Sequence, residues 1–90
     1  MSKNLFRGSQ EPVSIFVATS KYPGDFSLKI YNSAGEFVRV LDDRQITEPF
    51  QHTYLWDGRN RYGEMCGSGV YLIRLIEPYG VRTARVLLVR

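Results

Sequence analysis

The residues whose types could support chemistry gather in one stretch, WDGRNRYGEMCGSGVY, at positions 56–71. Asp57, Asn60 and Glu64 place side-chain oxygens three and four residues apart. Calcium prefers oxygen ligands, but an EF-hand loop carries more carboxylates, at alternate positions. The stretch therefore predicts no metal site, and these three residues are the calcium candidates to test.

Other site chemistries fit the sequence less well. Cys66 and His52 are residue types that can form a thiolate–imidazole pair, but one Cys and one His in an all-β domain are more often bystanders. A zinc site needs more Cys or His than the chain has. The glycines follow neither GxxxxGK[ST] nor a strand–turn–helix context, so they do not predict a phosphate cradle. We predict no enzyme activity and no cofactor.

The same residue types suit tight turns. Asp57 is placed to accept a hydrogen bond from the backbone two residues on, in an Asx-turn that Gly58 completes. Asn60 and Gly63 suit left-handed positions in a second turn. Trp56 is large enough to close the end of a small core. The stretch therefore predicts a folding device rather than a ligand site.

The elements around this stretch alternate apolar and polar residues with period two, which is typical of half-buried strands. Turn residues separate the alternating segments. The pattern predicts strands at residues 12–19, 26–32, 37–41, 51–56, 70–77 and 81–90, with turns at 22–25, 33–36 and 78–80. Short strands at this spacing predict an all-β, immunoglobulin- or fibronectin III-like antiparallel sandwich of about seven strands.

The alternation also predicts which side chains share one face of a strand. Phe26, Leu28 and Ile30 are expected to point inward. In each of the other strands one set is expected to share a face: Val13, Ile15 and Val17; His52, Tyr54 and Trp56; Tyr71, Ile73 and Leu75. The phase of residues 37–41 is ambiguous, which is compatible with a bulge between Val38 and Leu41. Residues 42–50 are expected to form the longest connection, and Gly35 to take a left-handed turn position.

Ninety residues predict one domain, here residues 12–90 after an N-terminal extension of residues 1–11. No apolar run reaches about 18 residues, so no membrane span is expected. The first residues lack the apolar region of a signal peptide. Two locations stay open: the cytoplasm if Met1 is the native start, or the cell exterior if the domain belongs to a longer secreted chain.

The net charge of +3 raises the question of nucleic-acid binding. No recognised nucleic-acid motif accompanies the charge, and the arginines alternate with apolar residues as on solvated strand faces. Nucleic-acid binding is therefore the weaker reading. The single cysteine excludes an internal disulfide.

Four segments carry a resemblance: IYNSAGEFVRVL, WDGRNRYGE, SGVYLIRL and the basic-apolar ARVLLVR. Over about residues 26–90 the chain resembles the immunoglobulin-like domain of the flagellar hook-capping protein. It also resembles the related C-terminal modules of secreted bacterial proteins, some of which are type IX secretion sorting domains. The resemblance implies that the WDG loop is a structural signature, made of Trp56, Asp57, Gly58, Asn60, Gly63, Gly69 and Tyr71.

These observations predict a non-enzymatic protein-binding or assembly module of a secreted or filamentous bacterial structure. The alternative is a C-terminal secretion, sorting or surface-anchoring domain of a larger protein. Sorting modules usually carry a Pro-Asn-Pro segment before the first strand, where this chain has GSQEPV.

The last strand is the predicted interaction element, because it carries large aliphatic residues on both faces. Its edge is expected to pair with a protein partner or with a second copy of the chain. Its arginines favour an acidic partner. The candidate interaction residues are Arg82, Arg85, Leu87, Val89 and Arg90. A cover provided by the N-terminal dozen residues is the alternative to a partner.

Overall fold

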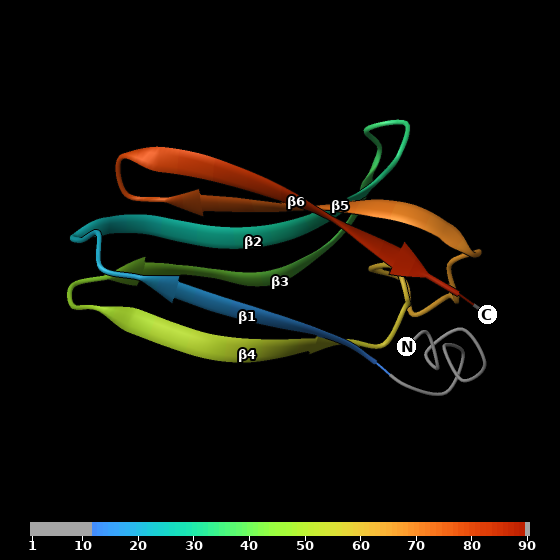
Figure 1. Ribbon diagram of the computed structural model, residues 1–90, viewed down its shortest axis with the longest axis horizontal. Helices are drawn as coiled ribbons and strands as arrows, with labels where there is room; N and C mark the ends of the chain where they lie inside the picture. The colour runs from blue at the N-terminus through green and yellow to red at the C-terminus, as the bar shows by residue number, and fades with distance from the viewer. Residues whose placement is uncertain (1–11, 90) are drawn as a thin grey trace.

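Residues 12–89 form six antiparallel β-strands in two sheets (Figure 1). The structure is a computed structural model that describes these residues, so the predicted extension at residues 1–11 and Arg90 lie outside the described part. The strands are β1 (Val13–Thr19), β2 (Gly24–Asn32), β3 (Phe37–Ile46), β4 (Phe50–Trp56), β5 (Gly69–Glu77) and β6 (Gly80–Leu88). The all-β prediction is confirmed, with six strands in the described part rather than about seven.

Two sheets of unequal size enclose one apolar core. β1 pairs with β4, and the larger sheet has the order β3-β2-β5-β6. Consecutive residues of a strand point to opposite sides, which is why the predicted inward residues of β2 are buried, as is the set of β5 residues predicted to share a face. The core contains Val17, Phe26, Leu28, Ile30, Val38, Ile46, Tyr54, Trp56, Tyr71, Ile73, Leu75 and Leu88. His52, expected on the same face of its strand as Tyr54 and Trp56, is exposed whereas those two are buried.

β3 is the element that the sequence described least well. It runs ten residues to Ile46, so the expected long connection at residues 42–50 is wrong and only residues 47–49 join β3 to β4. Two register shifts opposite β2 leave Val38 and Leu41 as extra residues in the ladder. The predicted bulge is thus confirmed, and there are two. Each bulge resets the alternation, which made the apolar phase of this segment ambiguous.

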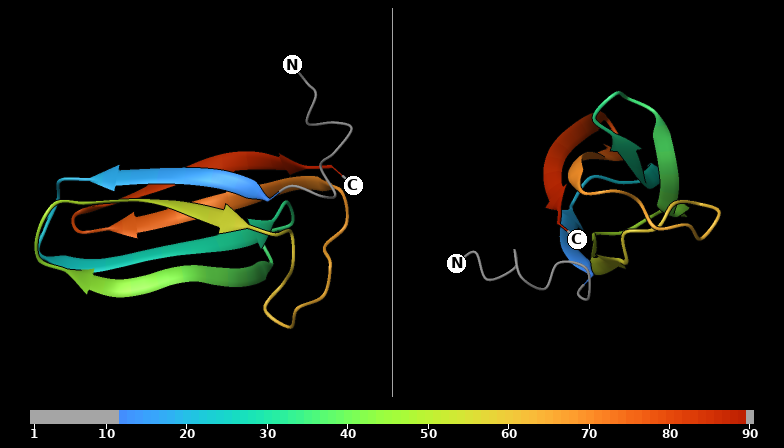
Figure 2. Two further views of the ribbon diagram at one scale, coloured as in Figure 1. Left: turned by 90° about the horizontal axis from the view of Figure 1, so that it is seen from below. Right: turned by 90° about the vertical axis from the view of Figure 1, so that its right-hand side faces the viewer.

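The strands place the connections at two ends of the molecule. The hairpin at residues 33–36 and the long loop at residues 57–68 lie at one end, and the turns after β1, β3 and β5 lie at the other (Figure 1). The end-on view in Figure 2 shows β1 and β6 on one side of the molecule, with β4 next to β3 on the other. The sandwich therefore has two seams between its sheets, one at β1 and β6 and one at β3 and β4.

Candidate functional site

Trp56 closes the core beneath the long loop. It is the last residue of β4 and its side chain is 0% exposed. Its Nε1 donates a hydrogen bond to the carbonyl of Arg59 at 2.9 Å. Its ring meets that of Tyr71 edge to face, with centroids 5.2 Å apart. Buried indole N–H groups need such a partner, so the loop both covers Trp56 and satisfies its polar atom.

Asp57 forms the expected Asx-turn. Its Oδ1 accepts a hydrogen bond from the backbone N–H of Arg59 at 3.0 Å. Gly58 follows with a φ of 80°, which L-residues other than glycine rarely adopt. Arg39 of β3 lies 3.3 Å from the same carboxylate oxygen. Asp57 therefore shapes the loop and attaches it to β3.

Asn60 works differently from the prediction. Asn60 does not have the predicted left-handed backbone conformation, because within residues 12–89 Tyr79, with a φ of 69°, is the non-glycine residue that has a positive φ. Gly63 does have the predicted conformation, with a φ of 84°. The Asn60 side chain instead accepts hydrogen bonds from the N–H groups of Tyr62 and Glu64, and its amide donates to Glu64 Oε1. The side chain bridges the turn, and Gly63 supplies the unusual backbone angle.

The same loop occurs a second time, which the sequence reading missed. In the β2–β3 hairpin Asn32 accepts from the N–H groups of Ala34 and Glu36 and donates to Glu36 Oε1. The backbone bonds correspond as well, because Gly35 donates to Asn32 as Gly63 donates to Asn60. The shared sequence N-x-x-G-E, at 32–36 and 60–64, is the signal that could have found it.

The calcium candidates have their oxygens engaged by N–H donors. Asn60 Oδ1 accepts two backbone hydrogen bonds, Asp57 Oδ1 accepts one from Arg59, and Glu64 Oε1 accepts one from Asn60. Over residues 12–89 no three His, Cys, Asp or Glu side chains come together as metal ligands. The loop geometry is that of a hydrogen-bonded turn.

Cys66 and His52 belong to different surroundings. The N–H of Cys66 donates to the Gly58 carbonyl at 2.8 Å within the long loop. The His52 ring lies on β4 between Phe50 and Tyr54, with its centroid 4.6 Å from that of Tyr54. His52 thus belongs to an aromatic row along the outside of the β3–β4 seam.

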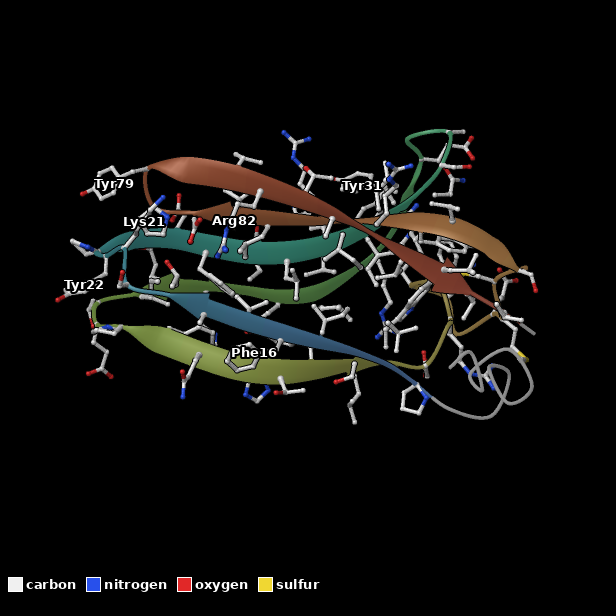
Figure 3. The ribbon with its side chains drawn as sticks, in the orientation of Figure 1. Phe16, Lys21, Tyr22, Tyr31, Tyr79 and Arg82 are labelled. Atoms are coloured by element: carbon white, nitrogen blue, oxygen red, sulfur yellow. The ribbon has the colours of Figure 1, made fainter. Side chains whose placement is uncertain are left out.

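The outer face of the larger sheet carries a basic-apolar surface. Cross-strand register sets Arg85, Leu72 and Tyr31 side by side on β6, β5 and β2. Leu87 pairs with Val70, and Lys29 pairs with Arg74. We call this surface the basic-apolar face; its residues are Lys29, Tyr31, Val70, Leu72, Arg74, Arg85 and Leu87. Tyr31, labelled in Figure 3, also meets the ring of Phe37, with centroids 5.8 Å apart.

The cations of this face form no ion pair within the described part of the chain. Lys29 and Arg74 are directly opposite one another, an arrangement that costs stability for like charges. Among the described residues, the ion pairs involve Lys21, Arg39, Arg44, Arg59 and Arg82, and none involves Lys29, Arg74 or Arg85. The face therefore combines apolar area with uncompensated positive charge.

The candidate interaction residues of the last strand divide between the two faces. Arg85 and Leu87 lie on the basic-apolar face, and Leu87 is 60% exposed. Val89 is half-buried and follows the end of β6, while Arg90 lies outside the described residues. Arg82 pairs with the inward residue Leu75, so it lies on the other side of the sheet.

Arg82 takes part in an ionic cluster around the buried carboxylate of Glu77, which the sequence did not indicate. Its guanidinium lies 2.9 Å from Glu77 Oε2 and also donates to the Ala18 carbonyl of β1 at 3.1 Å. Figure 3 shows this side chain on the inner side of β6, with Lys21 nearby. Lys21 Nζ is 3.9 Å from the same carboxylate. The cluster joins β5 and β6 to β1 across the open side of the sandwich.

A second, smaller apolar area lies on the outer face of the two-stranded sheet. Phe16 of β1 and Leu55 of β4 are 64% and 63% exposed. Their partners across the ladder are Thr53 and Ser14, so the two side chains are diagonal neighbours. This pair lacks the positive charge of the basic-apolar face.

Comparison of the chain with protein-family models, with curated proteins and with solved structures gives no match. Within the part that the structure describes, no helix has the length and apolar character required to cross a membrane.

Proposed function

We propose that this chain is a non-enzymatic protein-binding or assembly module with an immunoglobulin-like sandwich fold, acting in a secreted or filamentous bacterial structure. The observation that carries the proposal is the basic-apolar face. Apolar area next to unpaired cations, on an exposed sheet face, is typical of a surface that a partner covers. The resemblance of residues 26–90 to the hook-capping domain and to secreted modules supports the same class.

The partner should present an acidic surface with apolar side chains of its own. Lys29, Arg74 and Arg85 supply three positive charges, and Leu87 with Val70 supplies the apolar contact. A carboxylate placed between Lys29 and Arg74 would relieve the repulsion of that pair. Binding should therefore weaken as salt increases, because exposed charge pairs are screened over about 8–10 Å at ordinary ionic strength.

A matched pair of substitutions tests the proposal. Leu87 and Leu55 are equally exposed leucines, at 60% and 63%, on the outer faces of the two sheets. We expect Leu87→Glu to lose partner binding by at least about tenfold, and Leu55→Glu to retain it, because only the first places a charge within the basic-apolar face. Circular dichroism should show that both variants remain folded.

The measurement is purification of the tagged chain from its native source, with identification of bound proteins and of self-association by light scattering. Equal binding by Leu87→Glu and wild type would contradict the proposed face. Recovery of single-stranded nucleic acid in place of an acidic protein would reassign the face to nucleic-acid binding.

A further inference from the structure

The free edge of β1 borders an apolar groove that opens into the core. β1 pairs with β4 on one side, and no other strand within residues 12–89 pairs with it. The groove has a volume of about 250 Å³ and lies between residues 15–18 of β1 and residues 82–84 of β6. Leu28, Ile73 and Leu75 form its floor. Core side chains therefore lie at the bottom of an open groove at this seam of the sandwich.

The opposite seam is closed by side chains. Between β3 and β4, the Tyr54 hydroxyl donates to Asp42 Oδ2 at 2.5 Å. The Arg44 guanidinium covers the Phe50 ring, 5.0 Å from its centroid. At the β1–β6 seam the corresponding bridge is Arg82, which reaches the Ala18 carbonyl near one end of the groove. The two seams thus differ in how far the chain itself fills them.

The Arg82 contact shows which backbone groups of β1 face the groove. The carbonyl of Ala18 points toward β6, because it accepts from Arg82. Backbone groups of successive strand residues alternate in direction, so Ser14, Phe16 and Ala18 present their N–H and C=O groups to the free edge of β1. Ile15 and Val17 present theirs to β4. An unpaired strand edge of this kind readily accepts another strand.

The residues before β1 have the composition and the attachment point to fill this position. Residues 9–12, SQEP, include the turn-forming types Ser and Pro, and a hairpin loop needs about two to five residues. Residues 4–8 can then lie antiparallel to β1, opposite residues 14–18. Leu5 and Phe6 are adjacent, so in a strand they point to opposite sides.

We propose that residues 4–8 add to the free edge of β1 as a seventh strand, placing one of Leu5 and Phe6 in the groove between β1 and β6. The other side chain then lies on the outer face beside the exposed ring of Phe16, whose position is marked in Figure 3. Direct attachment to β1 gives this segment a high effective concentration over any separate chain. The proposal does not depend on the function of the basic-apolar face.

Nuclear magnetic resonance on the intact chain tests the proposal without a substitution. We expect nuclear Overhauser effects from Leu5 or Phe6 to the methyl groups of Ile15, Val17 or Leu75. We also expect the Phe16 and Ala18 amides to exchange slowly, as slowly as the Ile15 and Val17 amides that β4 protects. Both signals should be independent of protein concentration.

Fast exchange at Phe16 and Ala18 beside slow exchange at Ile15 and Val17 would overturn the proposal, because it shows an unpaired edge. If the protection of the Phe16 and Ala18 amides from hydrogen exchange rises with protein concentration, the proposal is also overturned, since a second copy of the chain would then cover the β1 edge. Contacts of Leu5 and Phe6 to residues away from the groove would do the same.

Deletion of residues 1–9 gives an independent check. Exchange at Phe16 and Ala18 should accelerate by at least about tenfold, while the amide of Ile73 in the central strand β5 keeps its protection. Deletion of residues 1–2 is the control and should change neither. If the longer deletion leaves Phe16 and Ala18 unchanged, residues 4–8 do not cover the β1 edge.

Discussion

Arg82 Nε lies 2.9 Å from Oε2 of Glu77, a carboxylate whose side chain is 2% exposed. Burial alone would raise the pKa of Glu77, but the hydrogen bond with Thr19 and the charges of Arg82 and Lys21 outweigh it, so the pKa lies below its ordinary value. A buried carboxylate is tolerated when donors and cations surround it in this way. The pair ties the β5–β6 hairpin to β1 through the additional bond from Arg82 to Ala18.

The lowered pKa of Glu77 makes the free energy of unfolding depend on pH. The unfolded chain takes up the proton first, so the contribution is complete above the ordinary pKa of 4.5 and is lost as pH falls from there through the folded value. Asp42 acts in the same direction, because hydrogen bonds from Tyr54 and Arg44 outweigh its burial and lower its pKa. Denaturant titrations between pH 7 and pH 3 measure this loss.

Glu77→Gln should lower the free energy of unfolding at pH 7 by about 1–3 kcal/mol, because it removes the charge that Arg82 and Lys21 contact. In this variant the free energy of unfolding should also decline less steeply below pH 4.5 than in wild type. Glu48→Gln, at an exposed position between β3 and β4, is the control and should follow wild type. A decline in Glu77→Gln as large as that of wild type would show that other groups cause it.

Trp56→Ala should destabilise the fold by about 3–5 kcal/mol, as expected for the loss of a fully buried aromatic side chain. The substitution removes the packing on Tyr71 and the shorter of the two hydrogen bonds that the Arg59 carbonyl accepts. Thermal melts followed by circular dichroism measure the effect. Tyr62→Ala, in the same loop but 71% exposed, should melt close to wild type. Similar midpoints for both variants would contradict the role of Trp56.

The two N-x-x-G-E loops should respond alike to loss of their asparagine. Asn60→Ala and Asn32→Ala each remove two hydrogen bonds accepted from backbone N–H groups and one donated to a glutamate. Each should cost about 1–2 kcal/mol in free energy of unfolding. Ser33→Ala, at an exposed loop position, is the control. Denaturation curves for the three variants decide whether both loops use the same bond set.

Calcium should leave the stability unchanged. The oxygens of Asp57, Asn60 and Glu64 accept hydrogen bonds from the loop, and a metal would have to displace those donors. Thermal melts in excess calcium and in chelator should overlay, since an ion bound by the folded state would raise the midpoint. A rise of several degrees with calcium would identify these residues as ligands after all.

Local chemistry determined much of the strand pattern and of the turns. The alternation in residues 26–32 and 70–77 required one apolar side for each strand, and Phe26, Leu28, Ile73 and Leu75 are buried accordingly. Gly35 and Gly63 have the positive φ that their turn positions suggested, because few other residue types accept it.

Contacts between distant segments decided the rest. Bulges at Val38 and Leu41 depend on pairing with β2, so the alternation of β3 could not show its length. Glu77 is two residues after Leu75 in β5, so it points inward as Leu75 does. The cations that pair with its carboxylate are Arg82 of β6 and Lys21, which follows β1. The basic-apolar face exists because register sets Lys29 opposite Arg74 and Tyr31 next to Leu72. Periodicity within a segment fixes which side of a strand is apolar, whereas the neighbour of each side chain is fixed only when strands far apart in the chain pair.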